Sequence, residues 1–405
     1  MKGMKPLEIA EYLMLAALCV VSTWSWELAI WMLVIFSVIV IARIIVTKKI
    51  GNPTLTKLMK LGLCMMAGYY IWQGITLFYT DNLSEGLGIM EKRLSLLALP
   101  LMLLLSDTSY LTPLRKRNLL YVFTASLVVR FFFRLTATLI AGNGIFVLVF
   151  DPVHHSYMAL FLLMAIGFIY SEWVNHRSEL PRWMPWTLCG TFIVMVAYLI
   201  LIDSRTGIAG LALIVLFIVI HQIVRQRNYK IGIALILCFL AAGCIMHFAL
   251  PESEKRLTQT FQNINSSKGD DRVGIYKCSL KASIDHLPWG TGVGDSKPVL
   301  EEYFIADGHD WSNLKELNTH NIYLETLLTL GLPGILLLLA MLILPTIDAC
   351  RRRDITLLTL MFVFAFGGLF EAILSRQVWF MFMVPMCYAL ASCERGRQRD
   401  LPDSL

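Results

Sequence analysis

Residues 319–346 read THNIYLETLLTLGLPGILLLLAMLILPT and hold only two ionic or imidazole side chains, His320 and Glu325. A bilayer's hydrocarbon core is about 30 Å thick and needs about 20 apolar residues per helix, so this stretch predicts a membrane span. Outward from it, apolar runs between polar breaks predict about 12 spans. They are 8–24, 27–46, 58–79, 87–106, 118–141, 152–171, 185–202, 206–224, 230–250, 319–346, 355–372 and 374–393. The predicted fold class is therefore an all-α polytopic membrane protein.

The composition of the 405-residue chain supports this class. Hydrophobic types make up 57% and charged types 16%, against about 25% charged residues in soluble domains. This balance excludes disorder, a coiled coil and an ordinary cytosolic enzyme. The net charge of +6 does not indicate nucleic acid, because the basic residues sit in short clusters between apolar runs. No cysteine or histidine spacing indicates a metal site or a disulfide framework.

The short basic clusters also predict the orientation, since cytoplasmic loops carry the Lys/Arg excess. They fall on one side if both termini are cytoplasmic. Residues 1–250 then hold nine spans, residues 251–318 form a long loop outside the cytoplasm, and residues 319–405 hold three spans and a cytoplasmic tail. Within the loop, Val273, Tyr276, Leu280 and Ile284 recur at helical spacing and predict an amphipathic helix over 272–286. Pro288 should end it, and Gly290–Gly294 should form a turn.

Cationic and imidazole groups near the predicted outer helix ends are the candidate functional residues, because ionisable groups in membranes are costly. They are Arg205, Arg272, His320, Lys92 and Arg93, with Arg130, Arg134, His154, His155 and Arg376 as further candidates. Each also has a structural interpretation. The arginines of the outer links can pair with neighbouring Asp residues, Lys92 and Arg93 can reach lipid headgroups, and Arg130 and Arg134 can join helices.

Taken together, these outer groups are mainly cationic and show no paired-carboxylate or P-loop signature. Guanidinium forks facing an outward cavity suit phosphate, so we expect an outward site for a lipid-linked phosphate or diphosphate. His320, expected in the first turn of its span, is the natural proton acceptor from an attacking hydroxyl. The arginines would then stabilise the leaving diphosphate.

At these residues the chain resembles the O-antigen ligase and polymerase superfamily of bacterial envelope glycan enzymes. The resemblance rests on short motifs in a fixed order, concentrated over about 200–335. They are Ser204-Arg-Thr-Gly207, Arg272-Val-Gly-Ile-Tyr-Lys277, Pro288-Trp-Gly-Thr-Gly-Val-Gly294, Thr319-His-Asn-Ile-Tyr-Leu324 and Leu330-Gly-Leu-Pro-Gly334, with His155-Ser-Tyr157 as a further feature. Tyr276 departs from the pattern, since many relatives have Trp there, and we expect this to change packing rather than chemistry.

The resemblance implies a metal-independent, C-type glycosyltransferase-like membrane fold in the bacterial inner membrane, with its active site at the periplasmic face and no cofactor. It implies a donor glycan on undecaprenyl diphosphate and an acceptor that is lipid A–core or another glycan. By resemblance, Arg205 and Arg272 bind the diphosphate, His320 activates the acceptor, and Arg93 or Lys92 matches a basic residue near an early outer loop.

Three functions stay open from the sequence. A ligase is favoured because one large outer loop precedes the His320 segment, whereas polymerases often add a second, for which residues 141–152 are too short. A polymerase of O-antigen, capsule or exopolysaccharide would use the same donor. A non-enzymatic transporter of lipid-linked glycans should show charges deep in the membrane or related halves, and neither is visible.

Overall fold

The computed structural model describes residues 3–140, 154–202, 204–224, 271–308 and 318–392, with a few separate positions between 227 and 237. The helices are α1 (Pro6–Val21), α2 (Trp26–Thr47), α3 (Lys57–Thr76), α4 (Leu83–Lys92), α5 (Ser95–Leu105), α6 (Pro113–Ile140), α7 (His155–Asn175), α8 (Met184–Leu201), α9 (Arg205–Val224), α12 (Asp271–Asp285), α13 (Ser296–Ala306), α14 (Ile322–Arg352), α15 (Ile355–Gly367) and α16 (Gln377–Leu390). Short 3-10 turns cover Arg177–Glu179 and Ile373–Ser375. The described ranges contain no strand, which confirms the all-α prediction there.

Six of the described helices are long and apolar enough to cross a membrane: α2, α6, α7, α8, α9 and α14. On α2, the side chains of Trp31, Val38 and Ile45 are more than 60% exposed, as expected of a helix face covered by lipid. The chain is thus a multi-pass membrane protein. The count of about 12 spans stays a prediction, and the span expected at 230–250 lies almost wholly outside the described residues.

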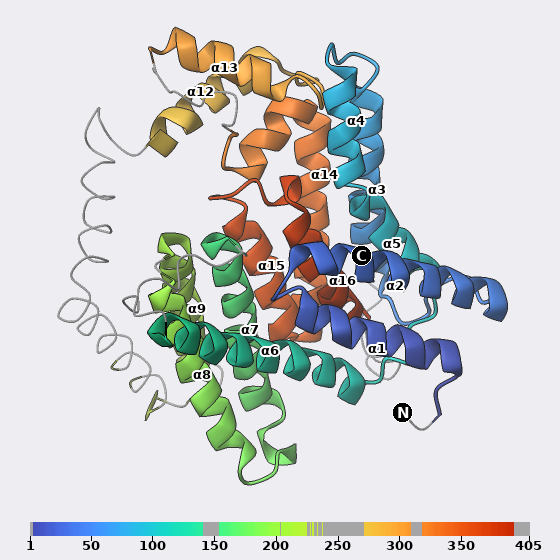
Figure 1. Cartoon of the computed structure of the whole chain (residues 1–405), viewed down its shortest axis with the longest axis vertical. Helices are drawn as coiled ribbons and strands as arrows, with labels where there is room; N and C mark the ends of the chain where they lie inside the picture. Colours follow the sequence, from blue (N-terminus) through green and yellow to red (C-terminus); the bar gives the residue numbers. More distant parts are fainter. Residues whose placement is uncertain are drawn as a thin grey trace.

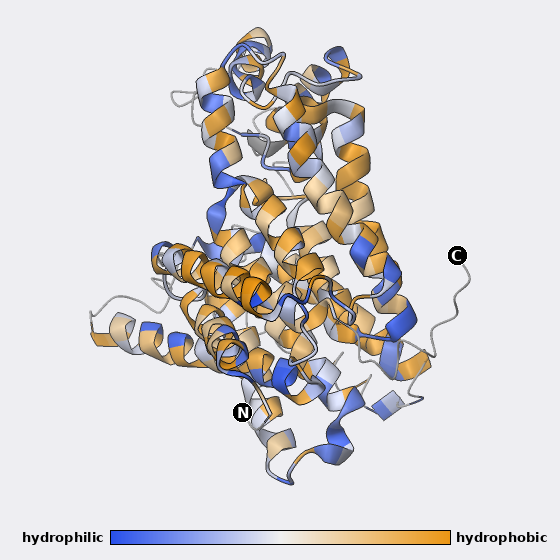
Figure 2. Ribbon diagram, turned by 90° about the vertical axis from the view of Figure 1, so that its right-hand side faces the viewer, coloured by the Kyte–Doolittle hydropathy of each residue, from blue (hydrophilic) through white to orange (hydrophobic). Residues whose placement is uncertain are grey.

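The helices run in two main directions. Figure 1 shows α3 and α14 along the long axis of the molecule, whereas α1, α2 and α6 run across it. Figure 2 shows hydrophobic residues along the helices and many of the hydrophilic ones near the two ends of the long axis. The interior is centred on α7, which is buried from Ser156 to Glu172. Since helices this steeply crossed cannot all follow one bilayer normal, length and composition alone do not fix the number of spans.

The stretch predicted as one span over 319–346 is instead two antiparallel limbs, and that prediction is wrong. Gly331 has φ 61° and ψ −154°, outside the helical range. The order of contacts along α3 shows the reversal. Tyr69 and Trp72 bond to Thr326 and Leu330 as the first limb rises, and then Gly68 and Gly62 face Leu337 and Pro345 as the second limb descends. The first limb, 322–330, is about 13 Å long at 1.5 Å per residue.

The turn is held by the glycine-rich loop after α12. The Leu332 amide donates to the Pro288 carbonyl at 2.8 Å, and the amides of Thr291 and Gly292 donate to the carbonyls of Leu328 and Thr329. These bonds satisfy carbonyls that a helix end leaves unpaired. A Cβ on Gly331 would lie 2.1 Å from the Pro288 carbonyl oxygen, so only glycine fits. The expected turn at 290–294 is therefore present, and it holds the end of the first limb through these hydrogen bonds.

The described part of the long segment 251–318 contains two helices. The helix predicted over 272–286 is present as α12, and α13 follows it unpredicted. Asp295 fixes this segment to the link between α3 and α4, because its carboxylate accepts hydrogen bonds from the Thr80 hydroxyl, the amides of Asp81 and Asn82, and the Asn82 side chain at 2.7–2.9 Å. The position of the His320 region thus depends on α3, α4 and α12 together.

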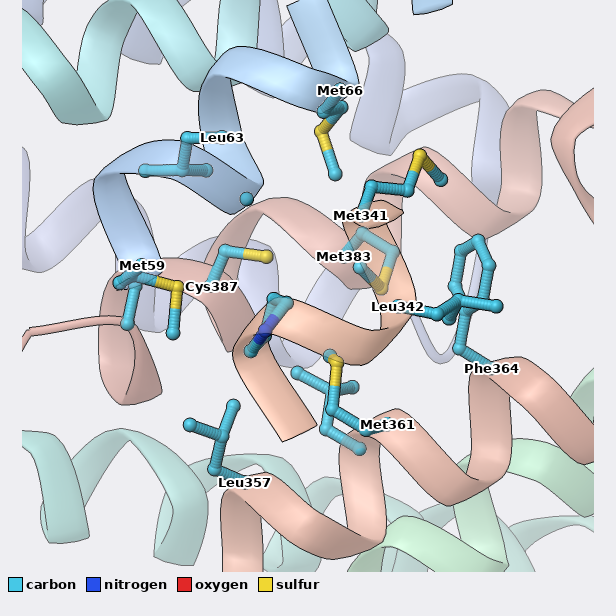
Figure 3. Close-up of a pocket in the computed structure, with 14 residues that line it drawn as sticks. Met59, Leu63, Met66, Met341, Leu342, Leu357, Met361, Phe364, Met383 and Cys387 are labelled. Atoms are coloured by element: carbon cyan, nitrogen blue, oxygen red, sulfur yellow. The ribbon is translucent and has the colours of Figure 1, made fainter. Parts of the chain in front are cut away.

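A small apolar cavity of about 30 Å³ lies deeper in the bundle, between α3, α14, α15 and α16. Figure 3 shows the sulfur-bearing side chains of Met59, Met66, Met341, Met361 and Met383 around it. Methionine is flexible and fills irregular gaps between helices. The methionines fill the space beside the point where Pro345 of α14 packs closely against Gly62 of α3.

Candidate functional site

His320 lies at the foot of the first limb, just outside the helix. The N-cap is Asn321, whose side chain accepts hydrogen bonds from the amides of Tyr323 and Leu324. His320 therefore lies two residues before the first helical residue, Ile322, and not in the first turn of the helix as expected. His320 has a left-handed φ of 46°, a conformation that is uncommon for a non-glycine residue and often found at functional sites. Its amide donates to Asn318 Oδ1 at 2.8 Å, and the Tyr276 hydroxyl donates to its carbonyl at 3.3 Å.

The His320 ring faces a carboxylate that the sequence reasoning missed. Nδ1 of His320 lies 3.7 Å from Oε2 of Glu371, and the two side chains are 30% and 13% exposed. Glu371 sits in the link after α15, where its amide bonds to Gly367. The apolar run predicted over 355–372 hid this residue. An acidic residue beside a predicted span end was the signal that could have found it, since such residues are costly in a membrane.

Arg93 joins the same cluster from an earlier part of the chain. The predicted span 87–106 is broken here into α4 and α5, and Arg93 is the buried C-cap of α4. Its Nη1 donates to Gln73 Oε1 at 3.1 Å and its Nη2 to Ser375 Oγ at 2.7 Å. Nη2 also lies 4.0 Å from Glu325 Oε1.

Glu325 links Arg93 to the His320 loop. Its other carboxylate oxygen accepts a hydrogen bond from the Thr319 hydroxyl at 3.2 Å, and Thr319 directly precedes His320. Two segments more than 200 residues apart thus meet at one carboxylate. Lys92, the alternative to Arg93, is exposed and lies near Glu85 instead.

The cluster keeps unused hydrogen-bonding capacity. Among the described residues, Arg93 Nε, Gln73 Nε2 and His320 Nδ1 are buried side-chain atoms without a hydrogen-bond partner. More than about 90% of buried polar groups are hydrogen-bonded in folded proteins. Three unsatisfied nitrogens in one connected cluster are therefore a feature that calls for a ligand or for proton transfer.

Arg205 and Arg272 both lie at the start of a helix, and the structure describes the side chain of Arg205 but only the backbone of Arg272. Arg205 begins α9 with an exposed side chain, beside Ser204, whose Oγ caps the helix by accepting from the Gly207 amide. A Cβ on Gly207 would lie 2.7 Å from Ala159, so this end of α9 packs on the first turns of α7. Arg272 lies in α12 one turn before Tyr276, which contacts the His320 carbonyl. The side chain of Arg272 lies outside the described residues.

The further candidates divide into two groups. His155 opens α7 with its ring 4.1 Å from that of His154, and Tyr157 in the same turn lies within electrostatic range of Glu371 and Arg376. Arg376 is the exposed residue after Ser375, which binds Arg93. Arg130, in contrast, is buried against the Trp24 ring at 5.5 Å and donates to the Thr23 carbonyl. With Arg134 one turn away, it joins α6 to the α1–α2 turn.

The helices and this polar cluster define a multi-pass membrane protein with an ionisable site between helix ends. Residues 190–339 match the family described as O-Antigen ligase, and this match supports placing the chain in the O-antigen ligase and polymerase superfamily. The match confirms the resemblance and spans Arg205, Arg272, His320 and the Gly331 turn. It implies a glycosyltransferase-like ligase or polymerase. No curated protein matches the chain. Within the described ranges, no three His, Cys, Asp or Glu side chains are grouped as metal ligands.

Proposed function

We propose that the chain is an O-antigen ligase, which transfers a polysaccharide from undecaprenyl diphosphate to a hydroxyl of lipid A–core at the periplasmic face of the inner membrane. The observation that carries the proposal is the cluster in which Arg93, Glu325 and Thr319 connect to the His320–Glu371 pair. It supports a reaction with both a cationic group for an anionic leaving group and a proton acceptor.

In this proposal His320 takes the proton from the acceptor hydroxyl as that oxygen attacks the anomeric carbon. The bond from this carbon to the diphosphate oxygen breaks, and the diphosphate leaves with the bonding electrons. Arg93, Arg205 and Arg272 stabilise its growing charge. Glu371 orients the imidazole and stabilises the imidazolium that forms. The cleaved diphosphate linkage supplies the driving force, so the reaction uses no nucleotide.

A transfer assay in proteoliposomes tests this function. The donor is a polysaccharide on undecaprenyl diphosphate, and lipid A–core or a lipid-linked repeat unit is offered as acceptor. Ligation to lipid A–core supports the ligase, whereas chain extension on the repeat unit alone supports the polymerase. Donor movement across the bilayer without any product would support the transporter instead.

The His320→Ala variant tests the base within the same assay. We expect a loss of transfer of about 10³-fold, within the usual range for general acid–base catalysis, while donor binding is retained. His286→Ala is the matched control, because the His286 ring, just after α12, bonds to the carbonyl of Ala282 and faces Tyr303. Full transfer by His320→Ala would refute its role as base.

A further inference from the structure

A second polar site lies at the far end of the bundle from His320. A cavity of about 510 Å³ opens where the start of α6 and α15 meets the last turns of α7, α14 and α16. Helix α15 begins at this cavity and ends beside Ile322, whose amide bonds to the Gly368 carbonyl. Its 13 residues separate the two sites by about 20 Å. The charge pattern predicts that this end is cytoplasmic.

The cavity carries an excess of positive charge. Its basic lining residues are Lys116, Arg117 and Arg351–Arg353, and its acidic ones are Glu172 and Asp354. Both acidic groups are already paired. Arg117 Nη2 lies 2.7 Å from Glu172 Oε2, and Arg352 Nη2 lies 3.0 Å from Asp354 Oδ2. The walls therefore supply more cations than their own carboxylates neutralise.

The walls are also fixed in place. The Lys116 ammonium donates to the Ser392 carbonyl at 2.7 Å, and Arg352 Nη2 donates to the Leu390 carbonyl at 2.7 Å. These bonds hold α6 and α14 to the end of α16 and satisfy its terminal carbonyls. The cavity is thus a built feature of the helix ends rather than a gap between mobile side chains.

Two cationic groups that line the cavity have no carboxylate partner among the described residues. Arg351 and Arg353 form no ion pair with any residue in the described part of the chain. The Arg352 side chain is only 4% exposed and is already paired with Asp348 at 3.3 Å and with Asp354 at 3.0 Å, so it fixes the wall of the cavity. Arg351 and Arg353 are the cations that an anion in the cavity would pair with.

We propose that this cavity binds the phosphate group of an anionic ligand. Guanidinium forks bind phosphate oxygens through paired, charge-assisted hydrogen bonds. The ligand source that fits best is an anionic phospholipid of the cytoplasmic leaflet, since basic pockets between helices on this side hold such headgroups. The apolar lining from Leu120, Phe168 and Leu390 would cover the glycerol part. Soluble phosphate is the second source of the same chemistry.

The test uses the full chain in detergent, with thermal unfolding followed as ligand is added. The probes are phosphatidylglycerol, phosphatidylcholine as zwitterionic control, and inorganic phosphate. The variant is Arg351→Gln/Arg353→Gln, which leaves the pairs of Arg117 and Arg352 intact. The matched control is Lys60→Gln/Arg182→Gln, which removes the same charge from exposed positions outside the cavity. Arg351→Lys/Arg353→Lys keeps the charge without the forks.

We expect phosphatidylglycerol to raise the unfolding midpoint of the wild type and of the control. The glutamine variant should bind it about 30-fold more weakly, because each of the two basic residues contributes about fivefold to binding. The lysine variant should fall between the wild type and the glutamine variant. Stabilisation by inorganic phosphate that is lost in the same variant would support the site with a soluble ligand. An equal response of wild type and glutamine variant to every probe, or stabilisation by phosphatidylcholine to the same extent, would overturn the proposal.

Discussion

Two arginines, Arg43 and Arg93, are buried to the same degree in this protein, yet their surroundings differ. Arg43 lies 2.5 Å from Glu11, and the two side chains are 4% and 0% exposed. Its remaining nitrogens donate to Glu11 and to the Asp107 carbonyl. Arg93 is also 4% exposed, but its carboxylate partner Glu325 is 4.0 Å away and 13% exposed, and its Nε has no partner in the described ranges.

The comparison separates a closed structural pair from an open cluster that we propose to be functional. A closed pair such as Glu11–Arg43 ties α1 to α2 and leaves nothing for a ligand. An open cluster such as that around Arg93 keeps donors free at a cost in stability, and such a cost is tolerated where a ligand is bound. Burial alone does not make this distinction, but the count of satisfied hydrogen bonds does.

The largest effect is expected for the closed pair. Arg43→Met removes one partner and leaves the Glu11 carboxylate buried, which should cost about 3–5 kcal/mol of folding free energy. Glu11→Gln/Arg43→Met should recover a large part of this loss, because no unpaired charge remains. Unfolding in a denaturing detergent series measures both variants. Transfer per folded molecule should stay unchanged, and a selective loss of donor binding would break the distinction.

A smaller effect, of the opposite kind, is expected for the open cluster. Arg93→Met should weaken binding of the diphosphate-linked donor by about 10- to 100-fold, since a hydrogen bond to a charged group contributes about 1.5–3 kcal/mol. Its cost in folding free energy should be smaller than that of Arg43→Met. Equilibrium binding and unfolding of both variants give the comparison. A variant that unfolds as readily as Arg43→Met and binds donor normally would make Arg93 structural.

Glu371→Gln should act on the rate and not on binding. The amide keeps the shape but cannot stabilise an imidazolium on His320, so we expect kcat to fall about tenfold, below the usual contribution of a catalytic base itself. The KM for donor should stay the same, and the pH dependence of kcat should shift. Steady-state kinetics across pH measures this, with Glu302→Gln as an exposed control. An unchanged pH profile would remove Glu371 from the mechanism.

The smallest effect concerns Asp295, a satisfied carboxylate outside the membrane spans. Burial raises its pKa, but hydrogen bonds from Thr80, Asp81 and Asn82 outweigh burial and hold the pKa below its ordinary value of 3.8. Its contribution to stability is therefore present above about pH 4 and is lost as pH falls through the lowered pKa. Asp295→Asn should cost about 1 kcal/mol near pH 7 and less at pH 3. A difference in unfolding midpoint that is constant with pH would contradict this.

The sequence predicted part of this arrangement and missed the rest for physical reasons. The all-α class and the helix at 272–286 followed from apolar periodicity and are confirmed in the described residues. The role of His320 stays a prediction from the cost of ionisable groups in membranes. The reversal at Gly331 was not predicted, because both limbs are apolar and only contacts with residues 288–292, distant in sequence, reveal it. Lys92 and Arg93 could not be told apart, because their difference arises from the break between α4 and α5.

The proposed diphosphate site can be tested by an electron cryo-microscopy structure of the protein with undecaprenyl diphosphate bound in a lipid nanodisc. We expect diphosphate oxygens within hydrogen-bonding distance of Arg205 and Arg272 and near Arg93, with the His320 ring beside the position where the acceptor oxygen would enter. A diphosphate held elsewhere, with His320 and Arg93 facing away from it, would show that these residues do not form the donor site.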